Sequence, residues 1–139
     1  KQTYLEQSKG HSQKEKRSLA LNLGVDPDAI KPEYEHYRNQ VAAAIPKPIE
    51  ESIDVDVKRS YNHMKDLTHE NLSNILKTYA IINSKINYCQ GMNFMAGYLF
   101  LAMDNREDLA FGAMREVIER FSMIHLFQKE QPMLKLMFY

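Results

Sequence analysis

The sequence predicts an all-α protein. Apolar residues recur at helical spacing in several segments, and capping residues, prolines and glycines separate these segments. No stretch alternates apolar and polar residues for long enough to predict a strand, and no internal repeat or low-complexity segment occurs. A chain of 139 residues, 44% of them hydrophobic, is one ordinary domain that can bury roughly two-thirds of its unfolded surface.

Two helices are predicted in the first third of the chain. Ser12, with Glu15 three residues later, resembles a capping box, and Gly24 stands where a helix would end, so residues 13–22 are predicted to be helical. A second helix is predicted to begin at Pro32, because proline suits the first turn of a helix. Its apolar face and the two prolines expected to end it are Tyr34, Tyr37, Val41, Ala44, Pro46 and Pro48.

The clearest helix signal follows Thr68. Threonine is a good N-cap, because its hydroxyl accepts a hydrogen bond from a backbone amide of the first turn. Apolar residues then recur as the stripe of an amphipathic helix: Leu72, Ile75, Leu76, Tyr79 and Ile82. A turn at residues 85–87 is expected to separate this helix from the next one.

The next helix is predicted from Cys89 to Met103. It is apolar on all sides, so we expect it at the centre of the protein. Its apolar run, which starts at Met92, is shorter than the roughly 20 residues that a membrane span requires. Asp104 and Asn105 are expected to break the helix, and Asn105 to cap the one that follows.

The helix after Asn105 is amphipathic. Its inward-facing residues are expected to be Leu109, Met114, Val117, Ile118 and Phe121. Arg115 and Glu119 are spaced as an i, i+4 ion pair. Pro132 is expected to start a last helix, and the apolar run at 134–139 suggests that the domain continues beyond the C-terminus.

Composition argues against several classes of function. Lysine plus arginine equals aspartate plus glutamate at 18 each, so no global field favours nucleic acid or an anionic membrane. Residues 1–16 lack the apolar stretch of a signal peptide. The single cysteine, Cys89, rules out an internal disulfide, fits a reducing compartment, and is most simply a small buried apolar residue. The five histidines show no metal-ligand spacing, and with a single cysteine a structural zinc site is not expected.

Two short motifs carry residues suited to chemistry. They are Ile53-x-x-Asp56-x-x-Arg59-Ser60 and Tyr88-x-Gln90-Gly91-Met92-Asn93. Arginine suits the charge of a phosphoryl-transfer transition state, because its planar guanidinium stays ionised and donates from a rigid fork. Glutamine can orient a water, because its amide both donates and accepts. Together Arg59 and Gln90 point to GTP hydrolysis, whereas either alone would be read as a surface ion pair or a cap.

In order and spacing, these motifs resemble the signature motifs of TBC domains, the GTPase-activating domains for Rab-type small GTPases. The resemblance runs from about Ile45 to the end of the chain and implies a multi-helix TBC-like fold, of which this chain is the N-terminal subdomain. TBC domains usually carry an upstream arginine-and-tryptophan motif, and this chain has no tryptophan. We therefore expect one partial TBC domain over 1–139, with divergent N-terminal helices at 1–44 and the motif-bearing helices at 45–139.

The resemblance implies a mechanism with two fingers. The domain would insert Arg59 and Gln90 into the nucleotide site of a bound Rab GTPase, where Arg59 stabilises phosphate charge and Gln90 positions the water. GTP and Mg²⁺ would come with the partner. The resemblance also implies a cytoplasmic protein that acts in vesicle trafficking and reaches endomembranes through its partner, without binding nucleic acid or inserting into the membrane.

Five further motif residues are expected to support the two fingers. Asp56 can cap a turn or pair with the guanidinium, and Ser60 keeps the hydroxyl of the threonine that TBC domains commonly have at this position. Tyr88 is expected to pack beneath the loop with its hydroxyl as an anchor, and Gly91 to let backbone approach closely. Asn93 can bond the arginine loop or satisfy a buried polar contact.

Two other interpretations remain open. A catalytically inactive TBC-like module could bind a GTPase or another protein as a scaffold, although a pure binding surface has no need of both Arg59 and Gln90. A helical adaptor with chance motif matches would predict that replacing either residue changes only local stability. Whether the protein counts as an enzyme also stays open, because it would act on its partner's active site.

Overall fold

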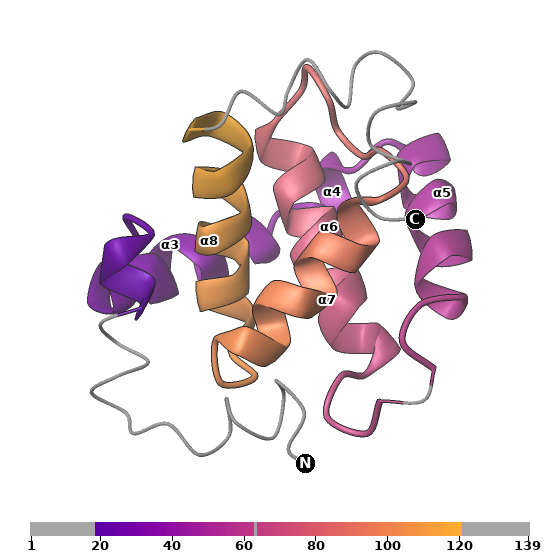
Figure 1. Ribbon diagram of the computed structural model, residues 1–139. Coiled ribbons are helices and arrows are strands. Elements are labelled where there is room, and N and C mark those ends of the chain that lie inside the picture. The colour runs from indigo at the N-terminus through magenta and orange to yellow at the C-terminus, as the bar shows by residue number, and fades with distance from the viewer. Residues whose placement is uncertain (1–18, 63, 121–139) are drawn as a thin grey trace.

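The computed structural model describes residues 19–62 and 64–120, and it is all-α, as predicted. Within these ranges no residue belongs to a strand. The helices are, in order, α3 (Pro27–Arg38), α4 (Val41–Ala44), α5 (Lys47–Lys58), α6 (His69–Ile82), α7 (Met92–Ala102) and α8 (Glu107–Arg120). Figure 1 shows α3 and α5 on opposite sides of the molecule, with α6, α7 and α8 between them.

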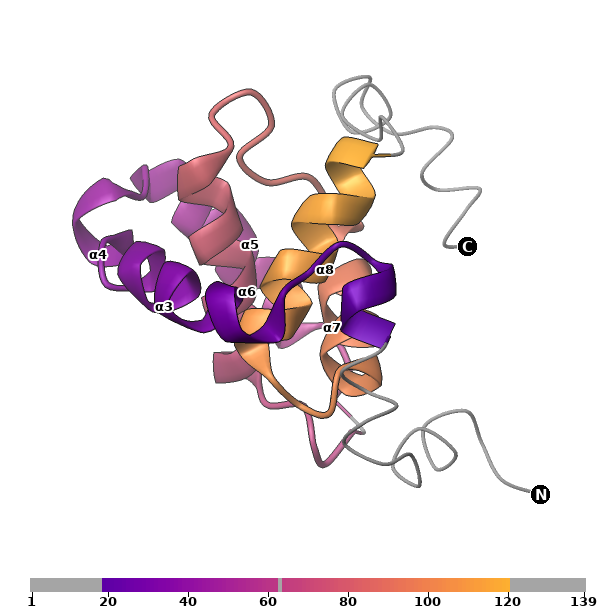
Figure 2. The ribbon, with the colours of Figure 1, turned by 90° about the vertical axis from the view of Figure 1, so that its left-hand side faces the viewer.

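The core surrounds α6, which contacts α3, α4, α5, α7 and α8. The turned view in Figure 2 shows α3 and α4 on one side and α7 on the other. The helix after Thr68 is confirmed: the Thr68 hydroxyl accepts from the amide of Asn71, and the Asn71 side chain completes a capping box. Four of its predicted core residues are fully buried: Leu72, Ile75, Leu76 and Tyr79. Ile82, at the end of the stripe, is half-buried.

The first predicted helix is confirmed only at its end, because residues 13–18 lie outside the described ranges. Residues 19–22 are helical, and Gly24 follows them with a φ of +87°. In this left-handed conformation glycine ends the helix without a steric penalty, as the sequence predicts. The amide of Val25 then returns to the carbonyl of Ala20 at 2.9 Å.

The prediction for the second helix was wrong at both ends. The helix α3 begins at Pro27, where the Asp26 side chain accepts from the amide of Asp28, and Pro32 lies inside it. Aspartate followed by proline is a stronger start signal than proline alone, because it supplies both a cap and a fixed φ. The helix ends at Arg38, and the two predicted face residues beyond it, Val41 and Ala44, form the separate four-residue α4, in which no residue is buried.

The bounds of the helix that carries the arginine motif were not predicted from the sequence. Helix α5 begins directly after Pro46, and Pro48 lies in its first turn. These prolines were read as the end of the preceding helix, and they also start this one, since proline suits a first helical turn. Ile53 and Val57 are the buried residues of α5.

Helix α7 is central and apolar, as predicted, but starts at Met92 rather than Cys89. Gly91 precedes it with a φ of +109°, so Cys89 and Gln90 lie in the turn before the helix. At the other end Asp104 and Asn105 break the helix, as predicted, with φ of 61° and 59°. Asn105 is not the cap of α8, which begins two residues later.

Helix α8 differs from its prediction in one ion pair. The carboxylate that pairs with the Arg115 guanidinium belongs to Glu33 on α3, not to Glu119 one turn away. This pair ties α8 to α3, and the hydrogen bond to Glu33 raises the pKa of Arg115. Of the predicted inward-facing residues, Leu109, Met114 and Ile118 are buried and Val117 is half-buried. Phe121 and the helix predicted from Pro132 lie outside the described residues.

Candidate functional site

Arg59 is the last residue of the turn that closes α5. It serves as the C-cap, with a φ of −97° and a ψ of −2°, and its amide donates to the carbonyl of Asp56 at 3.1 Å. Its side chain is exposed. Among residues 19–62 and 64–120, none forms a hydrogen bond or ion pair with its guanidinium. The fixed backbone therefore presents a cation that no described carboxylate neutralises.

Gln90 is exposed in the turn that leads into α7. It stands directly before Gly91, whose φ of +109° is a backbone conformation that residues with a Cβ rarely adopt. The close backbone approach expected at Gly91 stays a prediction, and the structure adds a left-handed conformation at Gly91 between Gln90 and the first turn of α7. The direction in which the Gln90 side chain points from the surface thus depends on the backbone conformation of this glycine.

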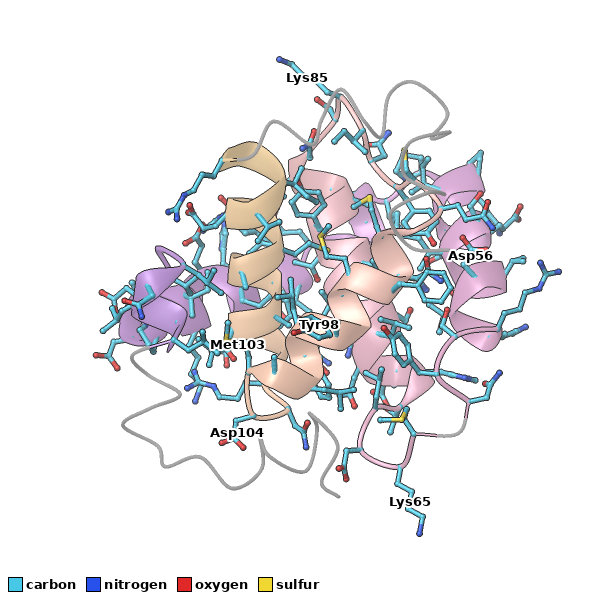
Figure 3. All side chains as sticks on the ribbon, viewed as in Figure 1. Asp56, Lys65, Lys85, Tyr98, Met103 and Asp104 are labelled. Carbon is cyan, nitrogen blue, oxygen red and sulfur yellow. The ribbon has the colours of Figure 1, made fainter. Side chains whose placement is uncertain are left out.

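Asp56 and Tyr88 join the two motifs. The Tyr88 hydroxyl donates to Oδ2 of Asp56 at 2.6 Å. Burial, together with this hydrogen bond, raises the pKa of Tyr88, so the phenol stays protonated as the donor. Asp56 lies on α5 at the right of Figure 3. Within the described part of the chain the Asp56 carboxylate accepts from Tyr88, and no bond joins it to the guanidinium of Arg59 or to a turn amide.

A second bridge joins Ser60 and Asn93. Nδ2 of Asn93 donates to Oγ of Ser60 at 2.6 Å, and this hydroxyl in turn donates to the carbonyl of Asp56 at 2.6 Å. Oδ1 of Asn93 accepts from the amide of Gly91 at 3.0 Å. Ser60 is 1% exposed and Asn93 is 3% exposed, so water does not compete for these bonds. Both alternatives for Asn93 therefore hold: it is a satisfied buried polar group, and it bonds the arginine loop.

These two bridges make one connected support for Arg59 and Gln90. Buried networks in which every member is satisfied stiffen the groups they join, since breaking any bond leaves a desolvated polar atom. In the described residues, no buried side-chain nitrogen or oxygen lacks a hydrogen-bond partner. The supports are buried or half-buried and the two predicted finger side chains are exposed. This is the arrangement expected when a rigid base presents two groups to another molecule.

An open groove of about 630 Å³ runs beside these residues. It lies between α5 and the segment before α7, and its lining residues are Pro48, Glu51, Ser52, Val55, Asp56, Tyr88, Cys89 and Gln90. Both charged residues among them, Glu51 and Asp56, are acidic. Phosphate groups bind where positive charge or backbone amides converge, so the groove does not suit the chain's own nucleotide.

The structure adds two observations on metals and membranes. In residues 19–62 and 64–120, no three histidine, cysteine, aspartate or glutamate side chains gather so that they could hold a metal ion. Across the same ranges, every helix is too short or too polar to cross a bilayer.

A family model of the Rab-GTPase-TBC domain matches residues 22–139. The chain belongs to this family. The match includes both motifs and extends upstream of them to α3 and α4. The TBC domain is thereby identified independently of the geometry around Arg59 and Gln90.

Of three curated relatives, one is named a TBC protein and another a GTPase-activating protein. The chain is 27% identical over 118 residues to "Ecotropic viral integration site 5 ortholog" of Drosophila melanogaster. The aligned residues cover 81% of this chain and 14% of that protein. It is 34% identical over 79 residues to "Growth hormone-regulated TBC protein 1-A" of Danio rerio, with 52% and 22% covered. It is 30% identical over 95 residues to "GTPase-activating protein GYP5" of Eremothecium gossypii, with 68% and 11% covered.

This TBC chain thus spans less than a quarter of the length of each of these three relatives. No solved structure matches it significantly. The geometry of the two motifs therefore comes from this chain alone.

One residue beside the motifs was missed at the sequence level. Tyr61 follows the arginine motif, and its hydroxyl donates to the carbonyl of Phe94 on α7 at 2.7 Å. A glycine inside an otherwise apolar helix, Gly97, was the available signal, because such glycines often mark a close approach by another group. The sequence offered no way to connect the two residues.

Proposed function

We propose that this TBC domain accelerates GTP hydrolysis by a Rab-family small GTPase, with Arg59 and Gln90 entering the partner's nucleotide site together. One observation carries the proposal: the bonds Tyr88–Asp56 and Asn93–Ser60 join the segments of two exposed side chains that are suited to phosphoryl transfer. A relative at 30% identity is named a GTPase-activating protein, which supports the same activity.

Arg59 would stabilise the charge that builds on the phosphate oxygens as the terminal phosphoryl group separates. Its guanidinium is exposed and is held only through its backbone, so it can pass from water into a partner's site without breaking an ion pair with a described residue. An arginine supplied in trans to a GTPase contributes about 10³ to 10⁵ in rate. Lysine would not replace it fully, because a point charge cannot reach two oxygens with a planar fork.

Gln90 would orient the attacking water. Its carbonyl oxygen can accept from the water while its amide donates to a phosphoryl oxygen, so one side chain fixes both reactants. The turn formed with Gly91 and anchored by Asn93 keeps Gln90 at the protein surface. A glutamine in such a position would do in trans what GTPases otherwise do with a glutamine of their own.

GTP and Mg²⁺ would arrive bound to the GTPase. The acidic lining of the groove beside Gln90 supports this division of labour, since it repels free phosphate. The protein would meet its partner in the cytoplasm, at the endomembranes where Rab proteins act in vesicle trafficking, and would reach the membrane through the GTPase. The five supporting residues would act by fixing geometry: Asp56, Ser60, Tyr88, Gly91 and Asn93.

The test is single-turnover GTP hydrolysis by a panel of Rab GTPases in the presence of the full-length protein. Stimulation of at least one Rab is expected, and Arg59→Ala should lower the stimulated rate about 10²-fold or more. Lys58→Ala is the matched control, because Lys58 is the exposed cation next to Arg59 and is expected to leave stimulation intact. Binding of a GTP-loaded Rab without stimulation would contradict the proposal and favour the catalytically inactive scaffold.

A further inference from the structure

Tyr61 lies two residues after Arg59 and is attached to α7. Its hydroxyl donates to the backbone carbonyl of Phe94 at 2.7 Å, and its ring meets the Phe94 ring edge-on, with centroids 6.2 Å apart. Tyr61 is half-buried, and burial raises the pKa of its phenol. The contact thus links the loop after α5 to the first turn of the helix that follows Gln90.

The ring of Tyr61 lies directly against the backbone of α7 at Gly97. A Cβ at Gly97 would sit 2.4 Å from Cε2 of Tyr61 and 2.8 Å from Cδ2, which real side chains essentially never do. Glycine inside a helix costs stability relative to alanine, so its presence at this point fits a need for space. The Tyr61 ring therefore packs against Gly97, where a side chain would leave it no room.

Tyr61 also holds an unusual backbone conformation. Its φ is +54°, in the left-handed region that non-glycine residues, and bulky ones above all, rarely adopt. Such a conformation persists only where surrounding contacts fix it, and it tends to occur at functional sites. Here the hydrogen bond of the hydroxyl and the packing of the ring against Gly97 hold the backbone of Tyr61 in this conformation. As a result, the chain turns directly after Arg59.

We propose that Tyr61 is a positioning residue for Arg59, held in place by its contacts on α7 with Gly97 and the carbonyl of Phe94. This inference rests on the proposed function. Ser60 fixes the backbone one residue after Arg59 and Tyr61 fixes it at the next, both against α7. Gln90 lies immediately before the same helix. The first turns of α7 thus fix the position of the Arg59 guanidinium relative to the Gln90 amide.

The first test is Tyr61→Phe in the full-length protein, measured by single-turnover hydrolysis at varied concentrations of the activator. The maximal stimulated rate is expected to fall about three- to tenfold, as for the loss of one neutral hydrogen bond, with an unchanged half-saturating concentration. In an Arg59→Ala background the same change should have no further effect. Tyr34→Phe is the matched control, because it deletes a hydroxyl bonded to Glu107 in another part of the molecule. An equal loss with and without Arg59, or no loss at all, would overturn the proposal.

The second test does not need a GTPase. Amide hydrogen exchange around Ser60 and Tyr61 should accelerate in Tyr61→Phe and in Gly97→Ala, and should stay unchanged in Tyr34→Phe. Gly112→Ala is the control for the added methyl group, since its Cβ would also be crowded, at 2.9 Å from Val25, but on α8. Unchanged exchange in both Tyr61→Phe and Gly97→Ala would overturn the positioning role. If the native protein stimulates no Rab, the proposed function fails, and this measurement still decides whether Tyr61 holds the loop of Arg59.

Discussion

The hydroxyl of Tyr88 lies 2.6 Å from Oδ2 of Asp56, although 32 positions separate the two residues in the sequence. Each belongs to a different motif, and each stands close in sequence to one of the proposed finger residues. The bond therefore fixes the segment of Gln90 relative to the helix that ends at Arg59. A short bond between a protonated phenol and a carboxylate is also among the stronger hydrogen bonds in proteins.

Replacing Tyr88 with phenylalanine should weaken both stability and activity. The change removes the donor and leaves the half-buried carboxylate of Asp56 without it, which should cost about 1.5 to 3 kcal/mol of unfolding free energy. Stimulated hydrolysis should fall by more than Rab binding does, because the fingers lose alignment. Urea unfolding and single-turnover hydrolysis measure the two effects. Tyr37→Phe is the control, and a Tyr88→Phe protein that matches it in both measurements would exclude the bridge as a support.

Removing the hydroxyl of Ser60 should be costly for its size. Ser60→Ala leaves Nδ2 of Asn93 buried without its acceptor, which should cost about 1 to 3 kcal/mol of unfolding free energy. Ser60→Thr retains the hydroxyl, so it is expected to keep most of the stability and the stimulated hydrolysis. Thermal unfolding and the hydrolysis assay compare the two variants. Equal losses in Ser60→Thr and Ser60→Ala would argue that side-chain shape, not the hydrogen bond, matters here.

Gly91→Ala should misdirect Gln90. A φ of +109° strains any residue with a Cβ, at a cost of about 1 to 3 kcal/mol. The chain is expected to relax by rotating the turn, and stimulated hydrolysis should then fall toward the level of Gln90→Ala while the bulk of the fold survives. Circular dichroism and single-turnover hydrolysis of both variants check this. A stable Gly91→Ala protein with native stimulation would show that the turn does not set the direction of Gln90.

Stability should decline at alkaline pH, and two buried or half-buried tyrosines with carboxylate acceptors, Tyr34 and Tyr88, should contribute to the decline. Burial raises the pKa of Tyr34 and of Tyr88, each with a further contribution from an acceptor carboxylate. A phenol whose pKa is higher in the folded state contributes stability that is fully present below its unfolded pKa of about 10 and is lost above it. The free energy of unfolding should therefore begin to fall near about pH 10 and continue to fall above it.

Phenylalanine variants isolate this effect from other alkaline titrations. The fall in unfolding free energy should be shallower in Tyr34→Phe and in Tyr88→Phe than in the native protein. Urea unfolding across the same pH range measures the slopes. Identical slopes in all three proteins would mean that neither phenol titrates in the way its burial requires.

The sequence predicted those elements whose signals are local. Thr68 and the apolar stripe after it define α6, because capping and helical spacing act within a few residues. The start of α3 was misplaced because Pro32 was taken as the first turn, whereas Asp26 caps the helix and Pro27 begins it. The start of α7 was placed too early because only the structure reveals the positive φ of Gly91.

The contacts that hold the site are not local, and this limits what sequence could predict. The motifs supplied seven candidate site residues, and five of these share one network: Asp56, Ser60, Tyr88, Gly91 and Asn93. Which residue bonds which was not predictable, since Asp56 has its partner on another segment. The same holds for Arg115, whose sequence neighbour Glu119 competes with Glu33 from α3. Local spacing in the sequence indicates possible hydrogen-bond and ion-pair partners, and tertiary packing determines which of these pairs form.

The most direct measurement is single-turnover GTP hydrolysis of a responsive Rab with Arg59→Ala, Gln90→Ala and the double variant. Each single change should lower the stimulated rate about 10²-fold or more. The double variant should lose much less than the product of the two, because the side chains act as a unit on one transition state. Native stimulation by either single variant, or losses that simply multiply, would contradict the claim that one rigid support presents both residues to the same nucleotide.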